Sequence, residues 1–137
     1  MSSPAQALPV SKGIWWTSIV LSALPTLLVL MGSVMKLAKA PGVAEGFARA
    51  GLPEHLILPV GLIELVCVIV YVIPRTSALG AILMTGLLGG AALACIRVSD
   101  PTAPLPILCG ILAWGGLYLR DPRLRTLIPL RSRPSAS

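Results

Sequence analysis

The chain has 137 residues, of which 55% are hydrophobic and only 12% are charged, and its formal net charge is +6. A soluble domain is typically ~45–50% apolar and ~25% charged, and a small fold exposes a large surface that polar groups must cover, so the composition favours a membrane protein. Three cysteines without a CxxC pair and a single histidine argue against a disulfide framework and against a metal site.

Four apolar segments follow one another along the chain. A helix of roughly 20 apolar residues crosses the ~30 Å hydrocarbon core of a bilayer, and the segments that qualify or nearly qualify are residues 14–36, 56–73, 76–97 and 102–119. The last is the weakest, because Pro104 and Pro106 lie in its first turns, although proline is tolerated at a helix start. The sequence therefore predicts an all-α polytopic membrane protein. Its antiparallel four-transmembrane-helix bundle would occupy residues 14–120, between tails at 1–13 and 121–137.

The distribution of Lys and Arg predicts the orientation of this bundle. One side would hold Lys12, Arg75, Arg120, Arg123, Arg125, Arg131 and Arg133, and the other Lys36, Lys39, Arg49 and Arg97. Cytoplasmic loops carry an excess of these cations, so both termini are expected in the cytoplasm. The basic C-terminal tail is expected to contact anionic lipid headgroups, which is a simpler account of its charge than binding to nucleic acid.

The longest connection, residues 37–55, contains a short helical pattern. Val43 and Phe47 are four residues apart, and so are Glu45 and Arg49, a spacing that supports one or two helical turns with an apolar side and an ion pair. We expect a short interfacial helix between the first two spans. It would be either a simple connector or a lid over the mouth of the bundle.

The third span contains a small-residue motif. Gly86 and Gly90 form a GxxxG pair, and Ala94 continues the same helical face. Small residues allow helices to approach closely in lipid. The motif predicts a helix–helix contact, either within the bundle or between copies in a homo-oligomer.

The second span carries one carboxylate, Glu64, close to its middle. A charge at mid-membrane costs from ~2.5 kcal/mol upward, so Glu64 should face the interior and be paired or protonated. Residues at helical spacing on its face are Gly61, Cys67, Val68 and Tyr71, whereas the opposite face carries Leu62, Val66, Ile69 and Ile73.

Two cations lie within plausible reach of Glu64, namely Lys36 at the end of the first span and Arg97 at the end of the third. The sequence does not choose between them. The resulting polar cluster of Glu64, Lys36 and Arg97 would either bind a ligand or handle protons, or be a buried ion pair that fixes the register of the helices. A quinone headgroup is a ligand that a carboxylate and a cation beside an apolar cavity would suit.

Several segments together resemble the DoxX-like family of four-helix bacterial membrane proteins. They are "MGSVMKLAKAP", "LPVGLIELVCVIVYVIPRTSALGAILMTGLLGGA", "RVSDP" and "WGGLYLRDPRLRTLIPLR", and the resemblance covers about residues 15–131. The positions that match the family pattern are Gly32, Lys36, Gly61, Glu64, Leu65, Gly90, Ala91, Arg97, Asp100 and Pro101. One departure is Cys95, where many members have a histidine two residues before the arginine.

The resemblance implies a protein of the bacterial inner membrane. Some relatives are membrane subunits of redox assemblies, including thiosulfate–quinone oxidoreductases. The first functional hypothesis is a non-catalytic membrane subunit or anchor with membrane or redox protein partners, because we find no catalytic or cofactor motif. The alternatives are a quinone- or lipid-binding subunit of a redox complex and a small transporter.

Overall fold

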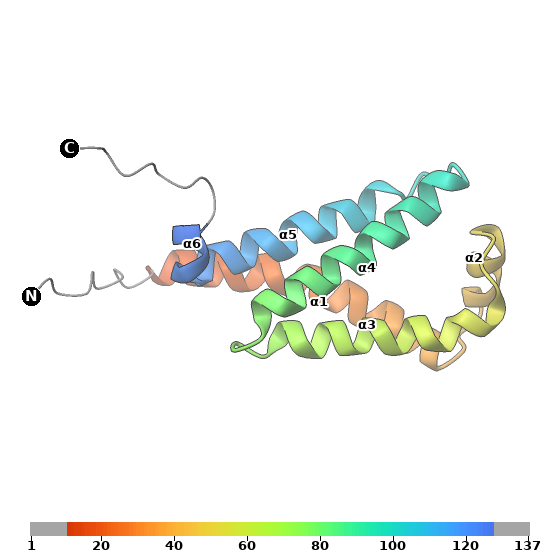
Figure 1. Cartoon of the computed structure of the whole chain (residues 1–137), viewed down its shortest axis with the longest axis horizontal. Coiled ribbons are helices and arrows are strands. Elements are labelled where there is room, and N and C mark those ends of the chain that lie inside the picture. Colours follow the sequence, from red (N-terminus) through yellow and green to blue (C-terminus); the bar gives the residue numbers. More distant parts are fainter. Residues whose placement is uncertain (1–10, 128–137) are drawn as a thin grey trace, which may run out of the picture.

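The computed structural model describes residues 11–127, and every regular element in this range is a helix. Most of the predicted tail residues, 1–10 and 128–137, lie outside the described part. The elements are α1 (Lys12–Leu37), α2 (Val43–Arg49), the 3₁₀ helix η1 (Glu54–Leu56), α3 (Ile57–Val72), α4 (Ser77–Arg97), α5 (Pro104–Arg120) and α6 (Pro122–Leu127) (Figure 1). The all-α prediction is confirmed. The four long helices begin and end at most two residues from the bounds expected for the four spans.

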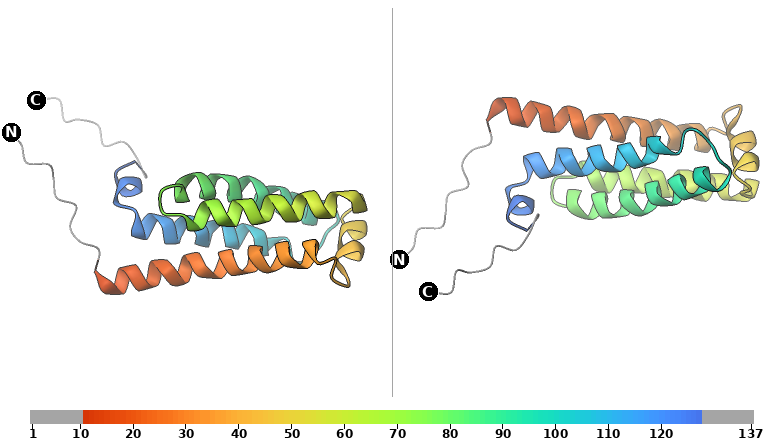
Figure 2. Two further views of the ribbon diagram at one scale, coloured as in Figure 1. Left: turned by 90° about the horizontal axis from the view of Figure 1, so that it is seen from below. Right: turned by 90° about the horizontal axis from the view of Figure 1, so that it is seen from above.

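The four long helices form a ring in which each packs against two others. The neighbours are α1 with α3, α3 with α4, α4 with α5, and α5 with α1. Successive long helices run in opposite directions, so that the start of α1 and α6 lie at one end of the bundle and α2 lies at the other (Figures 1 and 2). The two ends of the bundle therefore differ in the elements that cover them.

Within residues 11–127, three segments are long and apolar enough to cross a membrane, namely Lys12–Leu37, Glu54–Val72 and Ser77–Arg97. The fourth long helix, α5, has 17 residues, which is at the short end of the ~17–25 residues of membrane-spanning helices. The outward faces are apolar, as expected for side chains that meet lipid. On α3, for example, Leu62, Val66 and Ile69 are each more than half exposed.

The end of the bundle beside α6 is tightly packed around Tyr71 of α3. Its side chain is 1% exposed, and its hydroxyl donates to the Ala113 carbonyl oxygen of α5 at 2.8 Å and lies 3.0 Å from Ser22 Oγ of α1. A Cβ at Gly80 would meet the backbone of Tyr71, and a Cβ at Gly116 would lie 2.8 Å from the Ser18 carbonyl oxygen. Glycine is therefore required where α4 approaches α3 and where α5 approaches α1.

The opposite end of the bundle is closed by α2 and the loop that follows it. Two glycines with positive φ bracket this helix, Gly42 at +87° before it and Gly51 at +67° after it, a conformation that glycine adopts without steric cost. The helix predicted from Val43 and Phe47 is present. The predicted ion pair between Glu45 and Arg49 is wrong: among the described residues only Lys36 and Glu64 form one.

The α4–α5 turn at this end is held by Asp100. Its carboxylate oxygen Oδ1 accepts hydrogen bonds from the Thr102 hydroxyl at 2.7 Å and from the Thr102 backbone N–H at 2.8 Å. These bonds stabilise the charged form and lower the pKa of Asp100 from its ordinary value.

Candidate functional site

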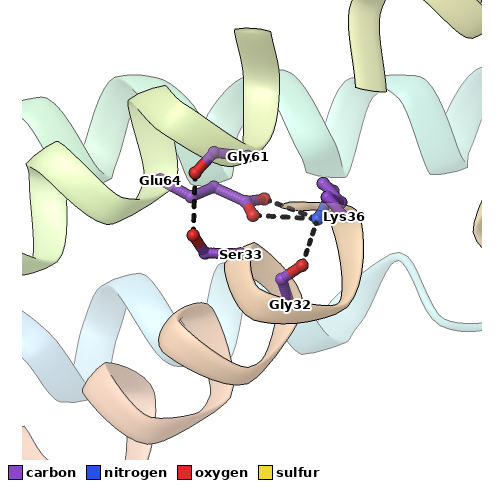
Figure 3. A network of polar contacts seen from close by, with 5 residues as sticks. All are labelled: Gly32, Ser33, Lys36, Gly61 and Glu64. Carbon is purple, nitrogen blue, oxygen red and sulfur yellow. Dashed lines mark hydrogen bonds and ion pairs between the residues drawn. The ribbon is translucent and has the colours of Figure 1, made fainter. Parts of the chain in front are cut away.

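An ion pair joins α1 to α3 in the half of the bundle nearest α2. Lys36 Nζ lies 2.8 Å from Glu64 Oε1 and 2.9 Å from Glu64 Oε2, and it also lies 3.4 Å from the Gly32 carbonyl oxygen (Figure 3). Of the two cations that the sequence offered, the structure therefore brings Lys36 to Glu64. The side chains of Lys36 and Glu64 are only 18% and 14% exposed, so the pair is largely but not completely buried.

Small residues allow this pair to form, because they bring the two helix backbones together. Ser33 Oγ donates to the Gly61 carbonyl oxygen at 2.7 Å, which ties α1 to α3 beside the pair (Figure 3). A Cβ on Gly61 would lie 3.0 Å from Lys36 Cβ, so a larger residue at this position would push Lys36 away. The sequence predicted that Gly61 lies on the same face of α3 as Glu64, but it gave no signal for the contact of Gly61 with Ser33.

The ion pair lines a cavity of about 590 Å³ whose walls are mostly apolar. Helix α2 and the loop after it form one wall through Val43, Gly46, Phe47, Ala50 and Leu52. Helix α4 forms another wall through Gly86, Leu87, Gly90, Ala91, Ala94 and Cys95. Of the two roles considered for residues 37–55, connector or lid, the lid would therefore have a cavity to cover.

The predicted packing role of Gly86 and Gly90 is wrong within the chain. A Cβ built on either glycine meets no atom within 4 Å, and both residues are exposed. Ala94 is half-buried and lines the same cavity. Because Gly86 and Gly90 have no side chain, they leave space in the cavity that larger residues would fill. The glycine that packs α4 against α3 is Gly80.

Arg97 stands apart from the ion pair. Its guanidinium donates to the Ala50 carbonyl oxygen, at the C-terminal end of α2. A cation is stabilised there by the unpaired carbonyl groups of the helix end. Arg97 therefore connects α4 to the short helix that covers the cavity, and it does not join the predicted cluster.

The hydrogen-bonding capacity of the pair is unequal. Lys36 Nζ faces three acceptors, namely the two Glu64 oxygens at 2.8 and 2.9 Å and, at a longer 3.4 Å, the Gly32 carbonyl oxygen. An ionised carboxylate has about four lone-pair sites, and in the described residues Glu64 accepts hydrogen bonds only from Lys36. The cavity thus offers unused acceptor positions on Glu64.

Within residues 11–127 no group of three or more His, Cys, Asp or Glu side chains is arranged to hold a metal ion. The position that departs from the family pattern, Cys95, lies on the cavity wall, with its sulfur 4.0 Å from Thr102 Oγ1.

Comparison with known proteins places the chain in a family. A search of curated proteins and a search of solved structures gave no match. A family model described as the DoxX-like family matches residues 20–116. This range includes α3, α4 and the larger parts of α1 and α5, and with them Lys36, Glu64 and Arg97. The chain therefore belongs to the DoxX-like family.

Proposed function

We propose that this protein binds a small amphipathic molecule in the cavity beneath α2, with the polar head of the molecule at the Lys36–Glu64 pair. The observation that carries the proposal is one ion pair on the wall of an otherwise largely apolar cavity of about 590 Å³. Ligand sites are typically apolar cavities of ~300–1,000 Å³ with a few placed polar groups. The pair and the cavity together fit that pattern.

The hydrogen-bond inventory narrows the class of ligand. Because Glu64 has unused acceptor positions on the cavity wall, a ligand head that donates a hydrogen bond would fit the pair. A phenolic hydroxyl does so, whereas a quinone carbonyl only accepts. The quinol form of a membrane quinone, with an apolar tail, is the class that fits best.

The proposal places the cavity in a bacterial inner membrane, crossed by α1, α3, α4 and α5 in alternating directions. The bundle end with α6 and the start of α1 carries Lys12, Arg75, Arg120, Arg123 and Arg125 among the described residues. The other end carries four, namely Lys36, Lys39, Arg49 and Arg97. The larger number of cations supports a cytoplasmic position for the α6 end and for both termini. The cavity would then open near the opposite face of the membrane.

Calorimetric titration of the purified full chain in detergent tests the proposal. The probes are decylubiquinol, kept reduced, and decylubiquinone, which lacks the hydroxyl donors. We expect the quinol to bind about tenfold or more tightly than the quinone, since a hydrogen bond to a charged group contributes ~1.5–3 kcal/mol. Glu64→Gln should remove this preference, whereas Glu45→Gln, on α2 but off the cavity wall, should keep it.

A second variant separates binding from folding. Gly90→Leu leaves the ion pair intact and places a side chain in the empty space of the cavity, so it should weaken both probes. Equal affinity for quinol and quinone would contradict the proposed hydrogen bond to Glu64. Unchanged binding in Gly90→Leu would place the ligand outside this cavity.

The first hypothesis from the sequence, a non-catalytic membrane subunit or anchor, is a separate proposal. The open cavity supports ligand binding more directly than it supports a protein partner. Purification from mild detergent, with identification of both proteins and lipids that accompany the chain, discriminates the two. A stoichiometric protein without any quinol would favour the anchor.

A further inference from the structure

The end of the bundle opposite the proposed quinol cavity carries a second cavity, of about 610 Å³. It lies between the α3–α4 turn, the C-terminal end of α5, and α6. Three arginines from these three segments line it, namely Arg75, Arg120 and Arg123, against one carboxylate, Asp121. The lining thus carries a net charge of +2.

These arginines have no carboxylate partner in the described part of the chain, where the one ion pair joins Lys36 and Glu64. Arg75 and Arg123 are exposed, and their guanidinium groups make no hydrogen bond among residues 11–127. Of the Asp121 carboxylate, Oδ1 accepts a hydrogen bond from the Arg123 backbone N–H at 2.9 Å, at the start of α6. The site therefore offers several unused N–H donors to an anion.

Arg120 is held in place by the packed core. Its guanidinium carbon lies 5.8 Å from the centre of the Tyr71 ring, a distance typical of a cation–π contact. Tyr71 is in turn fixed by its contacts with Ser22 and Ala113. One cation of the site is thus positioned before any ligand arrives.

The remaining wall of the cavity is apolar and includes Ala78, Leu117, Leu124 and Leu127. Leu127 is 74% exposed, at the end of a helix that lies beside the ends of the long helices (Figures 1 and 2). A soluble anion would make no use of these side chains, whereas the acyl chains of a lipid would cover them.

We propose that Arg75, Arg120 and Arg123 form a binding site for one anionic phospholipid, with its phosphate among the guanidinium groups and its acyl chains against Leu124 and Leu127. Guanidinium groups match phosphate oxygens with paired N–H donors. The site is independent of the quinol cavity, and its test does not depend on quinol binding. It also differs from diffuse attraction of the basic tail, because it assigns the lipid to a defined cavity.

Native mass spectrometry of the delipidated full chain in detergent measures this binding. The probe is palmitoyl-oleoyl-phosphatidylglycerol, compared with the phosphatidylcholine of the same acyl chains and with glycerol 3-phosphate. We expect one phosphatidylglycerol to bind at least tenfold more tightly than phosphatidylcholine. Each arginine near an anionic headgroup strengthens binding by electrostatic attraction. Arg75→Gln and Arg123→Gln should therefore each weaken binding about fivefold, and the double variant about 30-fold.

Lys12→Gln is the matched control, because it removes one exposed cation from the same end of the bundle without touching the cavity. It should change the affinity less than twofold. Because Arg75 and Arg123 are exposed, their replacement should not disturb the core or Arg120. Melting curves of these variants should therefore match the wild type. If Lys12→Gln lost as much affinity for phosphatidylglycerol as the arginine variants, diffuse charge rather than a defined site would explain the binding. If glycerol 3-phosphate bound as tightly as phosphatidylglycerol, the proposed contribution of the acyl chains would be wrong. Absence of preference for phosphatidylglycerol would also refute the proposal.

Discussion

Replacement of Lys36 by methionine should destabilise the protein by about 3 kcal/mol. The change keeps an unbranched side chain, one atom shorter, but leaves the Glu64 carboxylate without a hydrogen-bond donor among the described residues. Breaking a buried ion pair by removing one partner costs ~3–5 kcal/mol. The lower end of the range applies because the two side chains are 18% and 14% exposed and both line an open cavity.

Glu64→Gln should cost less, about 2 kcal/mol, since a hydrogen bond to a charged group contributes ~1.5–3 kcal/mol. The amide oxygen still accepts from Lys36, and Lys36 keeps the Gly32 carbonyl oxygen. The double variant should cost about 3 kcal/mol, well below the sum of the single changes. The coupling energy would then be about 2 kcal/mol, within the ~0.5–3 kcal/mol of residues in direct contact.

Reversible unfolding in mixed detergent micelles, followed by far-ultraviolet circular dichroism, gives the four free energies of this cycle. The control cycle combines Arg97→Met with Glu64→Gln. Arg97 bonds to Ala50 rather than to Glu64, so these two changes should be additive within ~0.5 kcal/mol. Coupling of Glu64 to Arg97 instead of Lys36 would refute the assignment of the partner.

Three other outcomes follow from the packing and the charge distribution. Gly80→Ala should lower the stability by ~1–3 kcal/mol, because its Cβ would meet the Tyr71 backbone, whereas Gly90→Ala, with no atom within 4 Å, should be neutral or stabilising by up to ~1 kcal/mol in thermal melting. Tyr71→Phe should cost ~1–3 kcal/mol in chemical unfolding, because the Ala113 carbonyl oxygen loses its buried donor. Reporter fusions after Gly51 and after Ser137 should report opposite sides of the membrane, and the same side for both would contradict the proposed topology.

Helical periodicity alone was sufficient to orient α3. The face predicted to be buried, with Gly61, Cys67, Val68 and Tyr71, is buried, and Leu62, Val66, Ile69 and Ile73 are exposed. The pattern works because one face of a helix in lipid is apolar by necessity while the other meets neighbouring helices. The sequence could not decide whether Lys36 or Arg97 is the partner of Glu64, since the answer depends on how α1 and α4 are placed along their axes relative to α3.

The small residues were the least predictable feature. A GxxxG pair permits close packing but does not require it, and in this chain Gly86 and Gly90 line a cavity. Gly80 and Gly116, which do allow helices to approach closely, are not part of a GxxxG pair. Their role depends on the bulk of what lies opposite, and Tyr71 lies on a different helix from Gly80.

Photolabelling with an azido-substituted quinol tests most directly whether the cavity beneath α2 is the binding site. The account predicts that the label attaches to the α4 segment of residues 86–95, which contributes six of the residues that line the cavity, and that decylubiquinol prevents this labelling by competition. Gly90→Leu should reduce this labelling. Labelling confined to the outer groove between α4 and α5, beside Gly110 and Trp114, or labelling that decylubiquinol does not displace, would contradict the account.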